Sequence, residues 1–228
     1  MTTPAHDIRL VVLDMAGTTV ADGGLVERAF GTAAQELGVE PGTADHDEKL
    51  SYVRATMGES KITVLRHLFG DEGRAQRANT AFETAYGELV DGGLIAPIPG
   101  ARETIEELTA TGRTVVLTTG FSRVTQDAVL DSLGWRDLVP LTLCPADAGG
   151  RGRPHPDMVL EAFLRTKSAD SVRQIAVVGD TSYDVLSGVR AGAGLVAGVR
   201  TGAHGDDAFR EAGAGHVLDS VAELPTLL

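Results

Sequence analysis

Short apolar runs alternate with amphipathic stretches along most of the chain. Five runs are continuous and rich in β-branched residues, and they end in small or acidic residues: 9–14, 114–120, 174–180, 194–199 and the short run 216–218. Unbroken apolar runs of this length indicate strands buried on both faces, as in a parallel sheet. Helical patterns separate them at residues 101–111, 124–133, 156–166 and 183–191. The alternation predicts an α/β fold with a doubly wound parallel sheet, a Rossmann-like core.

One segment departs from this alternation. Between the first strand and Pro97 the pattern contains no good strand candidate, and residues 25–37, 47–56, 62–69 and 74–90 all have helical spacing. The sequence Ala-Pro-Ile-Pro-Gly at residues 96–100 then interrupts the pattern, as a turn or hinge does. We therefore expect an α/β core made of residues 1–20 and 98–228, with a helical cap of residues 21–97 inserted after the first strand.

Length and charge narrow the classes of function. A chain of 228 residues is long enough to bury about 70% of its unfolded surface, so its core needs neither disulfides nor a structural metal. A net charge of −12 repels phosphate at long range, which argues against nucleic acid and anionic membranes as partners. A phosphorylated ligand would need a local pocket of donors or cations. No apolar run approaches the roughly 18 residues of a membrane span.

Cysteine usage and the start of the chain indicate a compartment. Cys144 is the sole cysteine, which excludes an internal disulfide and a multi-cysteine zinc site and fits a reducing environment. Residues 1–7 lack the basic start and apolar stretch of a signal peptide. We expect a cytoplasmic protein.

The most informative polar residues come directly after the predicted strands. Asp14 ends the first strand, and Thr119 lies at the end of the second. Asp180 ends the third strand, and Asp184 follows four residues later. In open α/β sheets, ligands bind at the carboxyl ends of the strands. These segments, together with Arg153 in the basic loop before the third strand, are expected to converge on one cleft.

This set of residues predicts phosphoryl chemistry. Clustered carboxylates need neutralisation, and a hard cation such as Mg²⁺ takes oxygen ligands. Thr119 and the glycine-rich turn backbone can donate hydrogen bonds to phosphoryl oxygens, and Arg153 can hold the phosphoryl group by charge. One carboxylate can act as a nucleophile that forms an aspartyl phosphate. Positioning and charge neutralisation supply most of the catalysis in such reactions.

Four ordered motifs carry a family resemblance. The sequence D-x-A-G-T-T at residues 14–19, then Thr119, then Arg153, then G-D-x-x-x-D at residues 179–184 resembles the haloacid dehalogenase superfamily, and a helical insertion after the first motif fits it too. The resemblance implies that Asp14 is the nucleophile and that Mg²⁺ is the cofactor. It implies metal ligation by Asp14, the Ala16 carbonyl and Asp180, with Asp184 in support, and phosphoryl binding by Ala16, Gly17, Thr119, Gly120 and Arg153.

Two features point to one branch of that superfamily. Phosphatases and mutases usually carry a second Asp two residues after the nucleophile, as a general acid, but this chain has Ala16. The D-x-A-G-T-T form resembles phosphonatases (phosphonoacetaldehyde hydrolases), which cleave a carbon–phosphorus bond. That family carries a lysine in the cap motif M-G-x-x-K, matched here by Met57, Gly58 and Lys61. The resemblance implies that Lys61 forms an imine with an aldehyde, and that the protein is a homodimer.

Two departures leave the substrate open. Phosphonatases have a His three residues after the lysine and a Tyr after the Thr-Gly turn, whereas this chain has Val64 and Phe121. The substrate is expected to be phosphonoacetaldehyde or a related phosphonate. One alternative is a Mg²⁺-dependent phosphatase for a small phosphate monoester, of the phosphoglycolate phosphatase kind. Another is a binding module switched by phosphorylation of the aspartate, which the long cap argues against.

Overall fold

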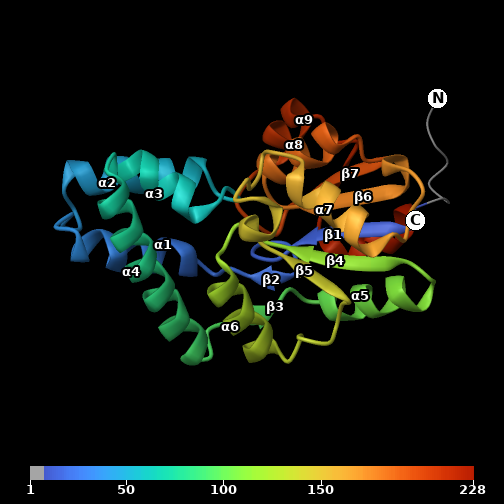
Figure 1. Cartoon of the computed structure of the whole chain (residues 1–228), viewed down its shortest axis with the longest axis horizontal. Helices are drawn as coiled ribbons and strands as arrows, with labels where there is room; N and C mark the ends of the chain where they lie inside the picture. The colour runs from blue at the N-terminus through green and yellow to red at the C-terminus, as the bar shows by residue number, and fades with distance from the viewer. Residues whose placement is uncertain (1–7) are drawn as a thin grey trace.

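The core of the molecule is a six-stranded parallel sheet (Figure 1). The computed structural model describes residues 8–228, so the expectation drawn from residues 1–7 lies outside the described residues. The strand order across the sheet is β5-β4-β1-β6-β7-β8. The strands are β1 (Leu10–Asp14), β4 (Thr114–Thr118), β5 (Leu141–Leu143), β6 (Ile175–Gly179), β7 (Leu195–Val199) and β8 (His216–Leu218). The predicted α/β fold with a doubly wound parallel sheet is confirmed.

Helices cover both faces of this sheet because alternate residues of each strand point to opposite sides. In β1, Val11 and Leu13 pack with one hydrophobic cluster, which includes residues of α5 and α6. Leu10 and Val12 pack with another cluster, which includes residues of α7. The core helices are α5 (Ala101–Ala110), α6 (Arg123–Leu133), α7 (Asp157–Thr166), α8 (Ser182–Ala191) and α9 (Asp206–Ala212), with 3₁₀ turns η2 (Pro145–Ala148), η3 (Val172–Gln174) and η4 (Val221–Leu227).

A separate group of four helices, called the helical block below, lies beside the carboxyl end of the sheet (Figure 1). It consists of α1 (Leu25–Glu36), α2 (Ala44–Ala55), α3 (Lys61–Phe69) and α4 (Glu72–Asp91). The chain enters and leaves it through a two-residue antiparallel pair, β2 (Val20–Ala21) with β3 (Ala96–Pro97). The segment predicted to be a turn or hinge therefore includes a short strand.

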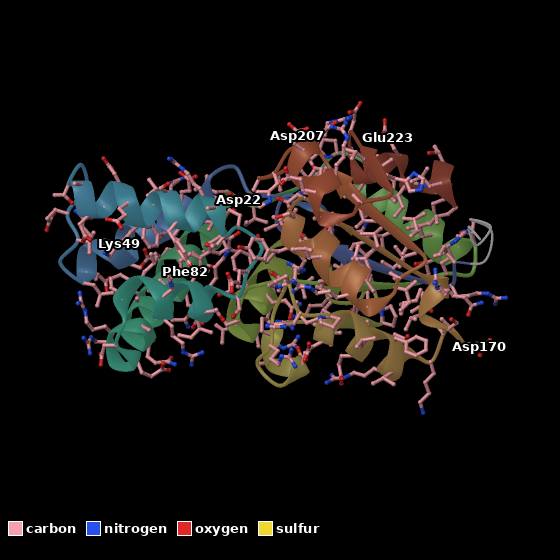
Figure 2. The ribbon with its side chains drawn as sticks, turned by 90° about the horizontal axis from the view of Figure 1, so that it is seen from above. Asp22, Lys49, Phe82, Asp170, Asp207 and Glu223 are labelled. Atoms are coloured by element: carbon pink, nitrogen blue, oxygen red, sulfur yellow. The ribbon has the colours of Figure 1, made fainter. Side chains whose placement is uncertain are left out.

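Side chains mark the inside and outside of the two parts (Figure 2). Phe82 is buried within the helical block, and Asp22 lies at the junction between the block and the sheet. Asp207, at the start of α9, points outward from the sheet part of the molecule. None of the helices within residues 8–228 has the length and apolar composition needed to cross a membrane.

Close packing holds α8 against the sheet. Gly188 lies in α8, and a Cβ added there would stand 2.9 Å from Cβ of Val177 in β6 and 3.1 Å from a methyl of Val196 in β7. The helix therefore approaches the sheet more closely than a larger residue allows. Because α8 starts immediately after Asp180, this contact also fixes the position of that carboxylate.

We expect Gly188→Ala to lower the free energy of unfolding by about 1–2 kcal/mol, because overpacking exceeds the gain of roughly 0.5–1 kcal/mol from removing a helical glycine. The matched control is Gly31→Ala in α1, where an added Cβ meets nothing within 4 Å. That variant should be more stable than the parent by about 0.5–1 kcal/mol. Urea unfolding of the three proteins measures both effects, and equal stabilisation by the two substitutions would contradict the close-packing argument.

Candidate active site

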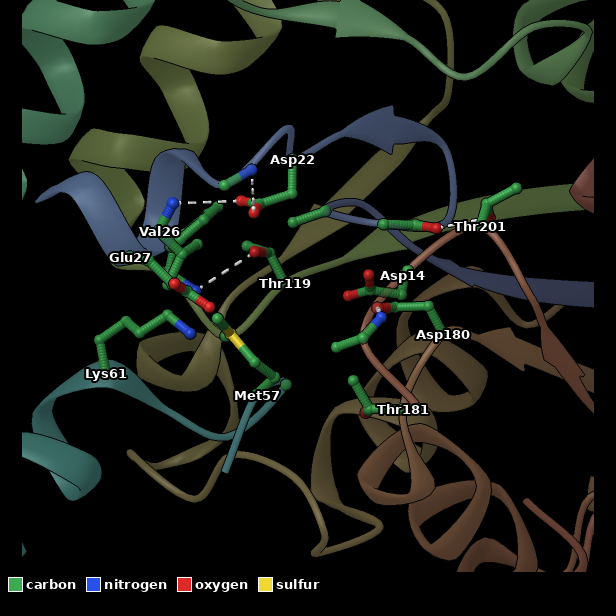
Figure 3. A pocket seen from close by; sticks show the side chains of 18 of the residues that line it. Asp14, Asp22, Val26, Glu27, Met57, Lys61, Thr119, Asp180, Thr181 and Thr201 are labelled. Carbon is green, nitrogen blue, oxygen red and sulfur yellow. Dashed lines mark hydrogen bonds between the residues drawn. The ribbon is translucent and has the colours of Figure 1, made fainter. Parts of the chain in front are cut away.

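A cavity of about 290 Å³ lies between the carboxyl ends of the central strands and the helical block (Figure 3). Asp14 at the end of β1 and Lys61 at the start of α3 face each other across it. The residues predicted from sequence are brought together here with one exception: the lining includes Asp14, Ala16, Gly17, Met57, Gly58, Lys61, Thr119, Gly120, Arg153 and Asp180. Asp184 lies behind the cavity wall.

Arg153 is the centre of the buried charges. Its Nη2 lies 2.7 Å from Oδ1 of Asp14, and its Nε lies 2.8 Å from Oδ1 of Asp184. Nη2 also donates to the hydroxyl of Thr118 at 2.7 Å. All three ionic side chains are at most 5% exposed, so each charge depends on its partners rather than on water. Arg153 thus neutralises one carboxylate at the end of β1 and another in the first turn of α8, and its charge also borders the cavity.

Asp14, Asp180 and Asp184 are close enough that ionising all three together is energetically costly. Burial raises the pKa of Asp14 well above its ordinary value, and the charges of Asp184 and Asp180 raise it further, while Arg153 acts in the opposite direction. Burial, followed by the charge of Asp184, raises the pKa of Asp180 to about 7. Three carboxylates and one guanidinium leave two net negative charges in the site, which a divalent cation would offset.

Asp180 is held by the loop that follows β7. Its Oδ2 accepts the N–H of Ala203 at 2.8 Å, and its Oδ1 accepts the hydroxyl of Thr18 at 3.4 Å. Only glycine fits beside it: a Cβ on Gly202 would stand 1.9 Å from Oδ2, and one on Gly17 would stand 2.4 Å away. Residues 201–203 of the cavity wall were not predicted, although they directly follow the fourth predicted strand, at the same edge of the sheet as Asp14 and Asp180.

The donor set fits Mg²⁺. Asp14, Asp180 and the backbone at Ala16 offer hard oxygen atoms on the cavity wall, which are the ligands this cation prefers. Oδ2 of Asp184 instead accepts the N–H and hydroxyl of Thr181, at 3.1 and 2.5 Å, and its Oδ1 faces Arg153. Within residues 8–228, no group of three or more His, Cys, Asp or Glu side chains is arranged to hold a metal ion. A cation would therefore rest on two carboxylates and a carbonyl, with Asp184 orienting Arg153.

Thr119 is positioned to donate to a ligand. Its Oγ1 accepts the N–H of Phe121 at 3.2 Å, which leaves the hydroxyl proton for another acceptor. The residue is 2% exposed and borders the cavity. A phosphoryl oxygen in the cavity would provide that acceptor.

Lys61 is the cation that the helical block contributes to the cavity. Its backbone N–H donates to the carbonyl of Gly120 at 3.2 Å, which ties the start of α3 to the core. Its Nζ lies 5.6 Å from the ring centre of Phe121. Burial lowers the pKa of Lys61, and Asp22 contributes the largest opposing charge effect, ahead of Asp14. A larger fraction of neutral amine is therefore available than for a lysine in water.

Glycines allow the block to touch the core closely. A Cβ on Gly58 would stand 2.4 Å from the hydroxyl oxygen of Thr181, and one on Gly120 would stand 2.7 Å from the carbonyl oxygen of Glu59. Nη1 of Arg153 also donates to the Gly58 carbonyl at 3.4 Å. The loop preceding α3 is thus seated on three core segments, and this seating sets the position of the Lys61 amine.

Two acidic residues of the cavity wall were not anticipated. Asp22 accepts the N–H groups of Gly24 and Val26, at 3.0 and 3.3 Å, just before α1 (Figure 3). Glu27 in α1 accepts two hydrogen bonds from Arg54, both at 2.8 Å. The sequence does indicate a local role for Asp22, since an Asp followed by Gly-Gly ahead of a helical pattern is a favourable helix start. Its position in the cavity follows only from the way α1 meets the sheet.

Comparisons with known proteins agree with this geometry. Residues 8–192 match the family described as haloacid dehalogenase-like hydrolase. The chain is 29% identical over 221 residues to the probable phosphatase IndB of Dickeya dadantii, which covers 94% of this chain and 91% of that protein. It is 28% identical over 264 residues to phosphonoacetaldehyde hydrolase of Bacteroides fragilis, with 97% and 95% covered. The crystal structure of a phosphonoacetaldehyde hydrolase like protein from Oleispira antarctica matches with a TM-score of 0.81 and 25% identity, covering 99% and 92% of the two chains.

The raised pKa of Asp180 predicts a pH-dependent response to Mg²⁺. Because its pKa is higher in the folded than in the unfolded chain, this carboxyl stabilises the fold at acid pH, and that contribution is lost as the pH rises from about 4 through about 7. Added Mg²⁺ should therefore raise the melting temperature more at pH 8 than at pH 5, by roughly 2–4 °C per kcal/mol regained. Asp180→Asn should abolish this difference, whereas the exposed-site control Asp170→Asn should keep it. Thermal unfolding measures both, and an equal Mg²⁺ shift at the two pH values in the parent would count against the site.

Proposed function

Because the chain belongs to the haloacid dehalogenase-like hydrolase family, we propose that it hydrolyses the carbon–phosphorus bond of phosphonoacetaldehyde or a related small phosphonate. One observation carries this proposal: a lysine amine and an aspartate carboxylate face each other across one cavity (Figure 3). The first suits a carbonyl group and the second suits a phosphoryl group, and phosphonoacetaldehyde carries both groups on adjacent carbons.

Lys61 would activate the substrate for cleavage. Its neutral amine adds to the aldehyde carbon, and the adduct takes up one proton and expels water, which gives a protonated imine. Oδ of Asp14 then attacks phosphorus, and the electron pair of the breaking carbon–phosphorus bond moves into the imine to form an enamine. Water hydrolyses the aspartyl phosphate to free phosphate, while protonation and hydrolysis of the enamine release acetaldehyde and the amine. Burial of Lys61 supports this role because it lowers the pKa of the amine.

Other residues would position the phosphoryl group. The hydroxyl of Thr119 and the guanidinium of Arg153 border the cavity near Asp14, where they can donate to phosphoryl oxygens. When bound, Mg²⁺ would be held by Asp14, the Ala16 carbonyl and Asp180, and its charge would neutralise the phosphoryl oxygens. The helical block would exclude water from the imine through the seating of its loop on Gly120 and Thr181.

The absence of an acid at position 16 supports a carbon leaving group. Ala16 borders the cavity two residues after the nucleophile, and its side chain has no proton to give. A phosphate ester needs protonation of its leaving oxygen, whereas an enamine carbon needs only the imine as electron acceptor. Ala16 and Lys61 therefore both favour cleavage of a carbon–phosphorus bond over hydrolysis of a phosphate ester.

A phosphatase for a small phosphate monoester is the second candidate. Val64 is buried, and the ring of Phe121 packs on Tyr86 with 4.7 Å between the ring centres. Neither side chain supplies the polar group that phosphonatases carry at these two positions, a His and a Tyr. The relative from Dickeya dadantii is named a probable phosphatase. In that case Lys61 would bind substrate charge rather than form an imine.

Three expectations accompany the main proposal. Mg²⁺ as the cofactor is supported by the donor set described above. A reducing, cytoplasmic environment is supported by Cys144, a buried free cysteine. A homodimer is inferred from the family resemblance alone.

Borohydride trapping tests the imine. With phosphonoacetaldehyde and borohydride, we expect one reduced adduct on Lys61 and loss of activity, because reduction makes the carbon–nitrogen bond permanent. Lys61→Arg keeps the positive charge but should form no adduct and lose carbon–phosphorus cleavage by at least about 10³-fold. The chain has three lysines, and Lys49→Arg on α2 is the matched control. Peptide mass spectrometry and phosphate release provide the readouts, and full activity in Lys61→Arg would refute the imine.

Ala16→Asp tests the missing acid. We expect this variant to gain phosphate-ester hydrolysis by about 10²-fold, because it places a proton donor two residues after the nucleophile. Ala16→Asn has nearly the same size without the proton and should gain nothing. A panel of phosphate monoesters with phosphate detection separates the outcomes. High ester turnover in the parent that survives Lys61→Arg would instead establish the phosphatase.

A further inference from the structure

Asp22 is a cavity-wall carboxylate with no assigned role, and it shares that wall with Lys61. We propose that Asp22 is the general base and acid of imine formation, which takes a proton from the Lys61 ammonium and returns it to the departing hydroxyl. The inference rests on the proposed function, since it requires that Lys61 reacts with an aldehyde. It assigns to a residue of the β2–α1 turn the proton transfer that this reaction needs.

Backbone donors hold the Asp22 carboxylate in place. The N–H of Gly24 donates to its Oδ2 at 3.0 Å, and the N–H of Val26 donates to its Oδ1 at 3.3 Å. Both donors are backbone groups at the start of α1, so the helix holds the carboxylate in place. Each carboxylate oxygen has a second lone pair, and these remain able to take a proton from the cavity side.

The other carboxylates of the cavity wall are engaged elsewhere. Asp14 is paired with Arg153 at 2.7 Å and serves as nucleophile in the proposed reaction. Glu27 is bound by Arg54 through two hydrogen bonds of 2.8 Å, and this pair lowers the pKa of Glu27, which makes it a weak base. Asp180 accepts from Ala203 on the far side of the cavity. Within residues 8–228, the ion pairs formed by Lys or Arg at 4 Å or less do not include Asp22.

Electrostatics couple Asp22 to Lys61. Burial is the main cause that raises the pKa of Asp22. The N–H groups of Val26 and Gly24 oppose it most, and the charge of Lys61 opposes it less. Burial also lowers the pKa of Lys61, and Asp22 is the charge that opposes this most. The two pKa values move toward each other, which lowers the cost of passing a proton from the ammonium to the carboxylate.

Other charged groups near this pair also shift the pKa values. Asp14 and Asp180 raise the pKa of Lys61, and Arg153 lowers it. Burial raises the pKa of Glu59 against the opposing charge of Lys61. On the remaining side, the ring of Phe121 lies 5.6 Å from Nζ and packs against Tyr86, whose pKa burial raises strongly. The ring of Phe121 has no group that accepts a proton, so on this proposal the carboxylate of Asp22 serves as the acceptor.

The proton inventory of the step balances. The ammonium of Lys61 carries three protons, and one passes to Asp22 to leave the neutral amine. The amine adds to the carbonyl carbon, and one of its two protons moves to the former carbonyl oxygen. Asp22 then gives its proton to that hydroxyl, which leaves as water when the carbon–nitrogen double bond forms. The imine nitrogen keeps one proton, water holds two, and Asp22 is again ionised.

Asp22→Asn tests this role because it keeps an acceptor for the helix start and removes the base. We expect formation of the borohydride-trapped Lys61 adduct with phosphonoacetaldehyde to slow by about 10²-fold at pH 7. Asp22→Glu keeps a carboxylate and should recover part of that rate. The matched control is Asp71→Asn, which makes the same change at the start of α4, where Asp71 accepts the N–H of Arg74 at 2.8 Å. Circular dichroism and thermal unfolding check that the variants are folded.

A second measurement separates proton transfer from charge or structure. The pH dependence of Lys61 labelling by an amine reagent reports its pKa, which should fall in Asp22→Asn because a negative charge is removed. The amine is then more often neutral, and a purely electrostatic role for Asp22 would speed adduct formation. Slower trapping together with a lower Lys61 pKa supports the proposal. An unchanged or faster trapping rate in Asp22→Asn overturns it while the imine stands, and absence of any adduct in the parent overturns the imine and this inference together.

Discussion

The burial of three carboxylates around one guanidinium is the constraint on which this structure depends. Asp14 ends β1 and Asp184 lies in the first turn of α8, and Arg153 joins them inside a site where little water can screen their charges. Such an arrangement is costly unless every partner is in place. The ionised site would carry an excess of negative charge, which a divalent cation such as Mg²⁺ would offset.

A second constraint concerns the junction between sheet and helical block. Gly58 and Gly120 bring two backbones together where any side chain would collide with Thr181 or Glu59. The bond from the Lys61 amide to the Gly120 carbonyl then fixes the first turn of α3. As a result, an amine that belongs to one part of the molecule is located as accurately as the carboxylates that belong to the other part.

Much of this arrangement could be predicted from the sequence, because its signals are local. The apolar runs that became β1 and β6 are unbroken and buried at every position, and the rule for strand ends placed Asp14 and Asp180 on one wall. Strand β5 (Leu-Thr-Leu, residues 141–143) was missed, although the equally short β8 was predicted. The contacts of Ala203 with Asp180 are made through backbone atoms, which no side-chain pattern reports. The position of Asp22 is likewise set by tertiary packing, and the sequence could predict only that this Asp lies near a helix start.

The strand order has a consequence for how the chain acquires its chemistry during synthesis. β1 is central and pairs with β4 and β6, so it has both of its neighbouring strands only after residue 179 has been made. The helical block depends on contacts between nearby segments and can form earlier, because short loops close at lower entropic cost. A chain that ends before β6 contains every residue of the helical block but lacks a central strand of the sheet. The carboxylate of Asp14 therefore has neither Asp180 nor Asp184 beside it until most of the polypeptide has been made.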